Sequence, residues 1–222
     1  MKYAIILTVL TLIINYVVLS CEGTGKPAAP GTIVSADTSL PELKQTAADY
    51  ISSGQFEKAI PYLIHAYRLD ALSYETCSML GECYYESGDF QKSIEYYKRI
   101  TEIIRPDDRQ MALAFTRTGD SQRESGLYRE AITSYLEAQE RMFIPNNYLL
   151  IAGIFDTGLH ETHDAITYYQ KYLDSMKDNI NIMLEDHLEK VKLRMEYLRN
   201  NPGNDQDALL PMYSWQEARR KI

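Results

Sequence analysis

The chain has 222 residues, of which 45% are hydrophobic and 24% charged, so it can form a hydrophobic core and is neither wholly disordered nor collagen-like. Its 31 acidic residues outnumber its 23 basic ones, and the resulting net charge of −8 repels nucleic acid. Three cysteines are too few to hold a disulfide scaffold together.

The first segment of the chain has the pattern of an export signal. Lys2 precedes a nearly continuous apolar run over residues 3–19, which is shorter than the roughly 20 residues that span a membrane comfortably. The run closes with Val18-Leu19-Ser20-Cys21, and this ending resembles the bacterial lipobox. The resemblance implies a lipoprotein signal peptide over 1–20, cleavage before Cys21, and acylation of the Cys21 thiol with lipid such as palmitate. An ordinary cleaved signal or an uncleaved anchor is the alternative.

Residues 21–39 follow as a predicted flexible tether, because they are rich in Gly, Pro, Ala, Ser and Thr. The residue after Cys21 is Glu22, whereas an aspartate there favours inner-membrane retention of Gram-negative lipoproteins. The resemblance therefore implies anchoring in the outer membrane. The segment after Cys21 lacks an acidic run, which favours the periplasmic face.

The middle of the chain contains four segments that repeat the same columns of residues. Small residues begin each segment at intervals of 34, 38 and 34 residues, namely Ala47, Gly81, Gly119 and Gly153. In the first three segments a glycine follows seven residues later: Gly54, Gly88 and Gly126. A second small column holds Ala59, Ser93, Ala131 and Ala165, and a large column holds Leu63, Tyr97, Tyr135 and Tyr169. The fourth segment has His160 where the glycine is expected.

This pattern resembles the tetratricopeptide repeat (TPR) family from residue 40 to about 176. The resemblance implies an all-α, right-handed superhelical solenoid of about four helix hairpins. Each first helix is expected to end at a glycine with positive φ, and the small columns are expected to mark close helix approaches. No hairpin buries its apolar face alone, so stacking supplies the core.

The 38-residue interval is longer than the others by four residues, which is close to one helical turn. Ile100, Ile103 and Ile104 continue the apolar stripe, and Pro106 followed by two aspartates is typical of a helix start. We therefore predict a lengthened helix rather than a flexible loop.

A capping helix is predicted over 179–200, which completes a solenoid domain over 40–200. Its apolar residues step by four and three positions along one face: Leu184, Leu188, Val191, Met195 and Leu198. Asn201-Pro202-Gly203 ends it. The C-terminal tail over 201–222 contains Trp215 and is either disordered or a short docking helix.

Residues that could carry chemistry are few. Cys77 and Cys83 are separated by about 9 Å of helix rise, beyond the ~7 Å that a disulfide bridges, and are expected to be buried thiols. The segment from His160 to Asp164 includes His163 and could offer metal ligands, but it falls at an inter-helix turn where polar residues are ordinary. No nucleophile elbow, HExxH or nucleotide motif is present. We therefore expect no metal, no cofactor and no enzymatic activity.

In the TPR family the first helices of the hairpins line a concave groove that holds a peptide segment. The resemblance places eleven residues there: Lys44, Glu75, Ser78, Glu82, Tyr85, Glu86, Thr116, Asp120, Arg123, Glu124 and Asn147. Acids outnumber bases in this set, and the lysine, arginine and asparagine clamp for a terminal carboxylate is absent. A basic or mixed-charge segment is therefore expected, with Tyr85 as an apolar anchor. A merely solvated acidic face is the equal alternative.

Together these features predict a lipid-anchored scaffold or adaptor of the bacterial cell envelope that binds other proteins, in an assembly, secretion or protease-adaptor role. The alternatives are an envelope metal-binding protein or enzyme that uses His160 and His163, and a glycan-capture lipoprotein. The sequence specifies neither the partner nor the oligomeric state.

Overall fold

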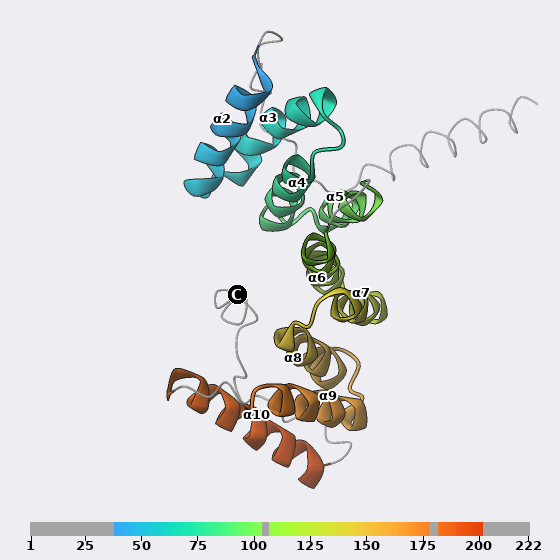
Figure 1. Cartoon of the computed structure of the whole chain (residues 1–222). Coiled ribbons are helices and arrows are strands. Elements are labelled where there is room, and N and C mark those ends of the chain that lie inside the picture. Colours follow the sequence, from blue (N-terminus) through green and yellow to red (C-terminus); the bar gives the residue numbers. More distant parts are fainter. Residues whose placement is uncertain (1–37, 104–106, 178–181, 202–222) are drawn as a thin grey trace, which may run out of the picture. The chain divides into compact units, whose positions relative to one another are not determined.

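The computed structural model describes residues 38–103, 107–177 and 182–201, with the side chains of 182–186 left out. These ranges contain nine α-helices, one π-helical segment and no strand (Figure 1). None of the helices in these ranges combines the length and apolar character needed to span a bilayer. The predicted signal peptide, the tether as far as residue 37 and the tail after residue 201 lie outside the described residues.

The helices form four hairpins in chain order, followed by one capping helix. The hairpins and the cap are α2 (Leu40–Ser52) with α3 (Phe56–Leu69), α4 (Tyr74–Glu86) with α5 (Phe90–Glu102), α6 (Asp108–Glu124) with α7 (Tyr128–Arg141), α8 (Pro145–Gly153) and η1 (Ile154–Gly158) with α9 (Thr162–Ser175), and α10 (Ile182–Asn200). The second helix of each of the first three hairpins also packs against the first helix of the next hairpin, and α10 packs on α9. The predicted solenoid of stacked hairpins is thereby confirmed.

The first three hairpins turn at glycines in the left-handed backbone region. Gly54, Gly88 and Gly126 have φ values of 70°, 82° and 75°, as predicted. The amide of the residue after each glycine donates a hydrogen bond to a carbonyl five residues earlier, at 2.8–2.9 Å. This pattern satisfies the carbonyls at the end of the first helix. In the fourth hairpin His160 takes a positive φ of 57° where the glycine is missing, an uncommon conformation for a residue with a side chain.

The two helices of a hairpin meet where a large side chain lies over a small residue. A Cβ atom added to Gly81 would lie 2.8 Å from the ring of Tyr97, and one added to Gly119 would lie 2.8 Å from the ring of Tyr135. Both tyrosines are buried. The predicted close approach is therefore confirmed at Gly81 and Gly119.

The four extra residues of the long interval extend α6 at its start. This helix has 17 residues against 13 in α4, and the carboxylate of Asp107 accepts a hydrogen bond from the backbone of Gln110 in a capping box. The lengthening therefore lies in α6 and not in the helix that contains Ile100. Its neighbour α5 ends at Glu102, and Ile103 has an extended ψ of 131°. The expectation that Ile103 continues a helix is wrong, because the aspartate cap starts a new helix after it; Ile104 lies outside the described residues.

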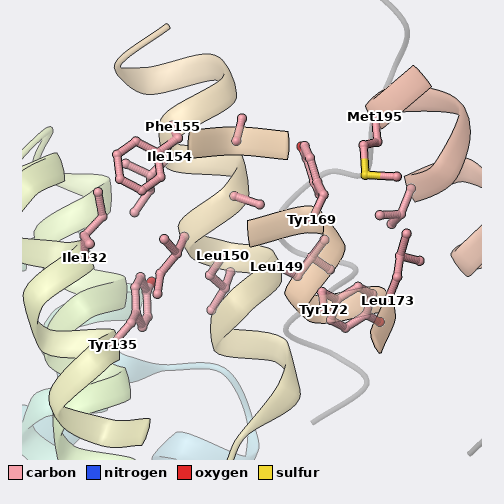
Figure 2. Close-up of a cluster of buried hydrophobic side chains, with 14 of the residues drawn as sticks. Ile132, Tyr135, Leu149, Leu150, Ile154, Phe155, Tyr169, Tyr172, Leu173 and Met195 are labelled. Atoms are coloured by element: carbon pink, nitrogen blue, oxygen red, sulfur yellow. The ribbon is translucent and has the colours of Figure 1, made fainter. Parts of the chain in front are cut away.

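The largest buried cluster joins the last two hairpins to the cap (Figure 2). Figure 2 shows side chains from α7, α8, η1, α9 and α10 in this cluster, including Tyr135, Leu150, Ile154, Tyr169 and Met195. On α10 the predicted apolar face is buried at Leu188, Val191, Met195 and Leu198. Leu184, the remaining member of that face, has no described side chain.

A buried ion pair also holds the cap, and the sequence analysis did not predict it. Arg194 of α10 donates two hydrogen bonds to the carboxylate of Asp156 in η1, with Nη2 and Nε at 2.7 and 2.9 Å from its oxygens. The Tyr169 hydroxyl donates to the same carboxylate at 2.8 Å. The hydrogen bond that Arg194 donates to Asp156 raises the pKa of Arg194, and burial followed by the Asp156 charge raises the pKa of Tyr169 well above its usual value. Arg194 therefore stays charged and Tyr169 stays protonated at neutral pH.

The contact between Tyr97 and Gly81 gives a first prediction. Gly81→Ala pushes a methyl group into the ring and is expected to lower the free energy of unfolding by about 1–3 kcal/mol. The first hairpin combines Ala47 with Leu63 at the same columns. Adding Tyr97→Leu to Gly81→Ala is therefore expected to recover part of the loss. Denaturant unfolding of both variants measures this, and a double variant that is no more stable than Gly81→Ala would contradict it.

The ion pair gives a second prediction. Arg194→Met leaves the Asp156 carboxylate buried without its cation and is expected to cost about 3–5 kcal/mol of unfolding free energy at neutral pH. An uncompensated buried carboxylate has a folded-state pKa above its unfolded value near 3.9, so the deficit shrinks as the pH falls and Asp156 takes up a proton. Unfolding measured from pH 7 to pH 4 tests both points. A deficit that stays constant over this range would show that the loss is not electrostatic.

Candidate functional site

A cavity of about 140 Å³ opens between α4, α5 and α6. Eight residues line it: Tyr74, Ser78 and Glu82 of α4, Tyr97 and Ile100 of α5, and Leu113, Ala114 and Arg117 of α6. The α4 residues are four positions apart and so lie on one helix face. Tyr97, Ile100 and Ala114 are 3%, 1% and 2% exposed and form an apolar floor, whereas Glu82 is exposed. The cavity therefore combines an apolar floor with polar groups nearer to solvent.

Charges of both signs lie at this cavity. Burial lowers the pKa of Arg117, but the neighbouring charges of Asp120 and Glu82 outweigh that effect, so its pKa is raised overall. The guanidinium lies 3.5 Å from the carboxylate of Asp120, its ion-pair partner on the same helix. Glu82, on the facing helix, adds a negative charge at the cavity wall. The positive charge of Arg117 is thus balanced by Asp120 on its own helix and by Glu82 on the facing helix.

Several predicted groove residues lie at or near this surface. Ser78 and Glu82 line the cavity, and Glu75, Glu86 and Glu124 are exposed. These four glutamates belong to α4 and α6, the first helices of the second and third hairpins. The acidic character predicted for this face is therefore present on exposed side chains.

Three other predicted groove residues make contacts within the fold. Nζ of Lys44 lies 2.7 Å from Glu75 Oε2 and 3.2 Å from Ser73 Oγ, so it ties α2 to the start of α4. The ring of Tyr85 is half-buried and packs edge-on against Phe90 at 5.5 Å between centroids. Arg123 forms an ion pair with Glu124 at 2.7 Å. Each of these side chains has a local structural contact that a partner has to share or displace.

Thr116, Asp120 and Asn147 require a correction, because the sequence placed them on an open groove and the structure buries them. They are 6%, 6% and 0% exposed. The Tyr135 hydroxyl donates to Asp120 at 2.8 Å, and the Asn147 amide donates to Thr116 Oγ1 at 3.1 Å. The cause is the close packing of α7 on α6, together with the contact that Asn147 of α8 makes with Thr116. The Asp120–Tyr135 bond joins the two helices of hairpin three, whereas the Asn147–Thr116 bond links hairpins three and four.

The groove assignment also missed residues that line the cavity, in particular Tyr74, Leu113 and Arg117. Tyr74 lies four residues before Ser78 on the same helix, so helical spacing alone could have included it. Arg117 gave no such signal, because an arginine on a polar helix is ordinarily solvated. Its place at the cavity depends on how α6 packs against α4 and α5.

The remaining candidates for chemistry lie apart from the cavity. His160 and His163 are both exposed around the start of α9, and among the described residues no three potential ligands gather in one place. Cys77 and Cys83 are buried and not disulfide-bonded, as expected. Burial raises the pKa of Cys77 to about 11 and that of Cys83 to about 12, so both remain protonated thiols at neutral pH.

Comparison with known proteins identifies the repeats. Residues 74–142 match the family model of the tetratricopeptide repeat, and this segment contains hairpins two and three with the cavity between them. The fold of the described helices is that of TPR proteins, which serve as scaffolds for interactions with other proteins. No curated protein sequence matches the chain.

Solved structures with the same fold are distant in sequence. The C-terminal part of a TPR repeat-containing protein from Cytophaga hutchinsonii has a TM-score of 0.61 at 20% identity, covering 75% of this chain and 64% of its own. MamA from Desulfovibrio magneticus RS-1, from residue 41 to its end, has a TM-score of 0.58 at 18% identity, covering 72% and 88%. A chain of the APC/C hetero-tetramer Cut9-Hcn1 has a TM-score of 0.54 at 19% identity, covering 69% and 30%. These similarities concern the fold.

Proposed function

We propose that this protein is a lipid-anchored TPR scaffold of the bacterial cell envelope, and that it holds a protein partner by a peptide segment bound across α4 and α6. The observation that carries the proposal is the cavity between these two helices, with its apolar floor and charged wall. A scaffold of this kind binds and positions its partner and performs no chemistry on it.

The lining of the cavity defines the segment that it fits. The floor of Tyr97, Ile100 and Ala114 is apolar, so it accepts one apolar side chain and disfavours a charged one. Glu82 at the cavity and Glu86 one turn further on favour a basic residue beside that side chain. Arg117 is already balanced by Asp120 and Glu82, so it does not reverse this preference. The fitting segment therefore carries an apolar residue flanked by lysine or arginine.

The anchor part of the proposal depends on the lipobox-like ending at Val18-Leu19-Ser20-Cys21. Lipid on Cys21 holds the protein at a membrane, and the residue Glu22 favours the outer membrane with the repeats on its periplasmic side. Confinement to a membrane surface raises the local concentration of the scaffold toward partners on the same membrane. A weak contact in a single cavity is then sufficient for selective recruitment.

The competing metal-site hypothesis is less well supported by the same structure. His160 and His163 supply two ligand groups, whereas a protein metal site needs three or four. Arg129 of the neighbouring hairpin forms an ion pair with Glu161, which engages the acid that lies between the two histidines. The turn thus has a structural use in joining hairpins three and four.

Filling the cavity tests the partner site. Ser78→Leu, at a half-buried position, and Ala114→Leu, at the floor, are each expected to reduce partner recovery by about tenfold or more, equivalent to at least ~1.4 kcal/mol. Glu82→Lys is expected to do the same by repelling the basic residue, and Glu57→Lys on the exposed side of α3 is the matched control. The measurement is quantitative mass spectrometry of proteins recovered with each variant from solubilised membranes, with thermal unfolding to verify folding. Recovery of identical partners by folded Ser78→Leu and Glu82→Lys would contradict the assignment.

The anchor is tested separately by Cys21→Ala. The wild-type chain is expected to incorporate labelled palmitate and to sediment with membranes, and the variant is expected to lose the label completely. Ser20→Thr, which retains Cys21, provides a control for general damage to the leader. Equal labelling of wild type and Cys21→Ala would refute acylation at this residue without affecting the cavity assignment.

A further inference from the structure

The first turn between hairpins exposes an unusual set of apolar side chains. Leu69 and Leu72 are 55% and 57% exposed, and Ala71 between them is also exposed. The turn is nevertheless fixed: the Leu72 amide donates to the Asp70 side chain at 3.2 Å, and the Asp70 amide donates to the Ala66 carbonyl at 2.9 Å. Two leucines are thus held toward solvent by an ordered backbone, although burying them is favourable.

This turn lies beside the point where the chain enters the repeats. Lys44, in the second turn of α2, contacts Ser73 and Glu75 directly after the α3–α4 turn. Pro41 in the first turn of α2 is exposed as well. The start of α2 and the turn at 69–72 therefore form one end of the first hairpin, which we call the entry end (Pro41, Leu69, Ala71 and Leu72).

The other end of the same hairpin differs in character. Its turn consists of Ser52, Ser53, Gly54 and Gln55, all exposed. The two ends are separated by the length of α2, which is about 20 Å for 13 residues. The first hairpin thus exposes leucines at the end where the chain enters, beside the charged Glu42, Arg68 and Asp70, and only polar residues and glycine in the turn at the other end.

We infer that the entry end rests on the lipid surface to which Cys21 is attached; this inference depends on the proposed lipid anchor. Sixteen residues separate Cys21 from Thr38, and the flexible tether that the sequence predicts there would span roughly 20–25 Å on average. This span keeps the start of α2 close to the membrane. Leu69 and Leu72 then enter the interfacial region, while the exposed Arg68 beside them meets anionic headgroups. The anchor and the leucines together orient the first hairpin with its serine turn away from the bilayer.

Tryptophan quenching by brominated lipid tests this orientation. The chain has one native tryptophan, so Trp215→Phe provides a silent background. In that background Leu72→Trp reports on the entry end, and Ser53→Trp is the matched control at the serine turn. The full chain is reconstituted in vesicles of phosphatidylethanolamine and phosphatidylglycerol with brominated acyl chains. Quenching at position 72 is expected to exceed that at position 53 by roughly threefold or more, with a blue-shifted emission.

Flotation of the same vesicles tests the lipid anchor separately from the orientation of the first hairpin. A chain that floats and shows equal or no quenching at positions 72 and 53 refutes the orientation while retaining the anchor. A chain that does not float refutes the anchor in that preparation. Coupling the Cys21 thiol to a maleimide lipid then attaches it artificially, because the buried Cys77 and Cys83 do not compete. Unequal quenching in that coupled form supports the entry end as a lipid contact, and equal quenching refutes it.

Discussion

The close contact between a glycine on the first helix and a tyrosine ring on the second sets the geometry of hairpins two and three. At Gly81 and Gly119 there is no room for a methyl group beneath the tyrosine ring. In the first hairpin the same columns hold Ala47 and Leu63, so a slightly larger residue faces a smaller partner. The volume of the two positions is shared between the helices. Protein interiors are close-packed, so the combined volume of the two facing side chains fixes the distance between the helices. It also fixes the positions of the tyrosine hydroxyl groups.

The tyrosine hydroxyls then determine where polar groups can be buried. Tyr135 donates to Asp120, and Tyr169, in the same column of the next hairpin, donates to Asp156. An arginine meets each carboxylate: Arg117 in the third hairpin and Arg194 from the cap in the fourth. The second hairpin differs from the third, because Gly81 is followed by Glu82 whereas Gly119 is followed by Asp120. Glu82 is exposed and lines the cavity with Tyr97. The cavity thus lies where the chain has an exposed glutamate in place of a buried aspartate.

The sequence could predict the repeat architecture because its signals are periodic and local. The three turn glycines, the small columns and the apolar face of the cap each follow from backbone or packing constraints that recur at fixed spacing. The groove set was less predictable. Ser78 and Glu82 line the cavity, but Thr116, Asp120 and Asn147 are buried, since a polar residue at a groove position is indistinguishable in sequence from one that bonds to the next hairpin. The Asp156–Arg194 pair spans 38 residues, so only tertiary packing brings it together. The leader around Cys21 lies outside the described residues and stays a prediction.

The central claim is that each hairpin is completed by its immediate neighbours through these contacts. Hydrogen exchange measured by mass spectrometry on Tyr135→Leu tests it most directly. The variant removes the ring from Gly119 and the hydroxyl from Asp120, so exchange is predicted to accelerate in α6 and α7 and in the adjoining α5 and α8. Exchange in α2 and α3, two hairpin boundaries away from α7, is predicted to remain unchanged. Equal acceleration throughout the chain, or none in α6 and α7, would contradict the account.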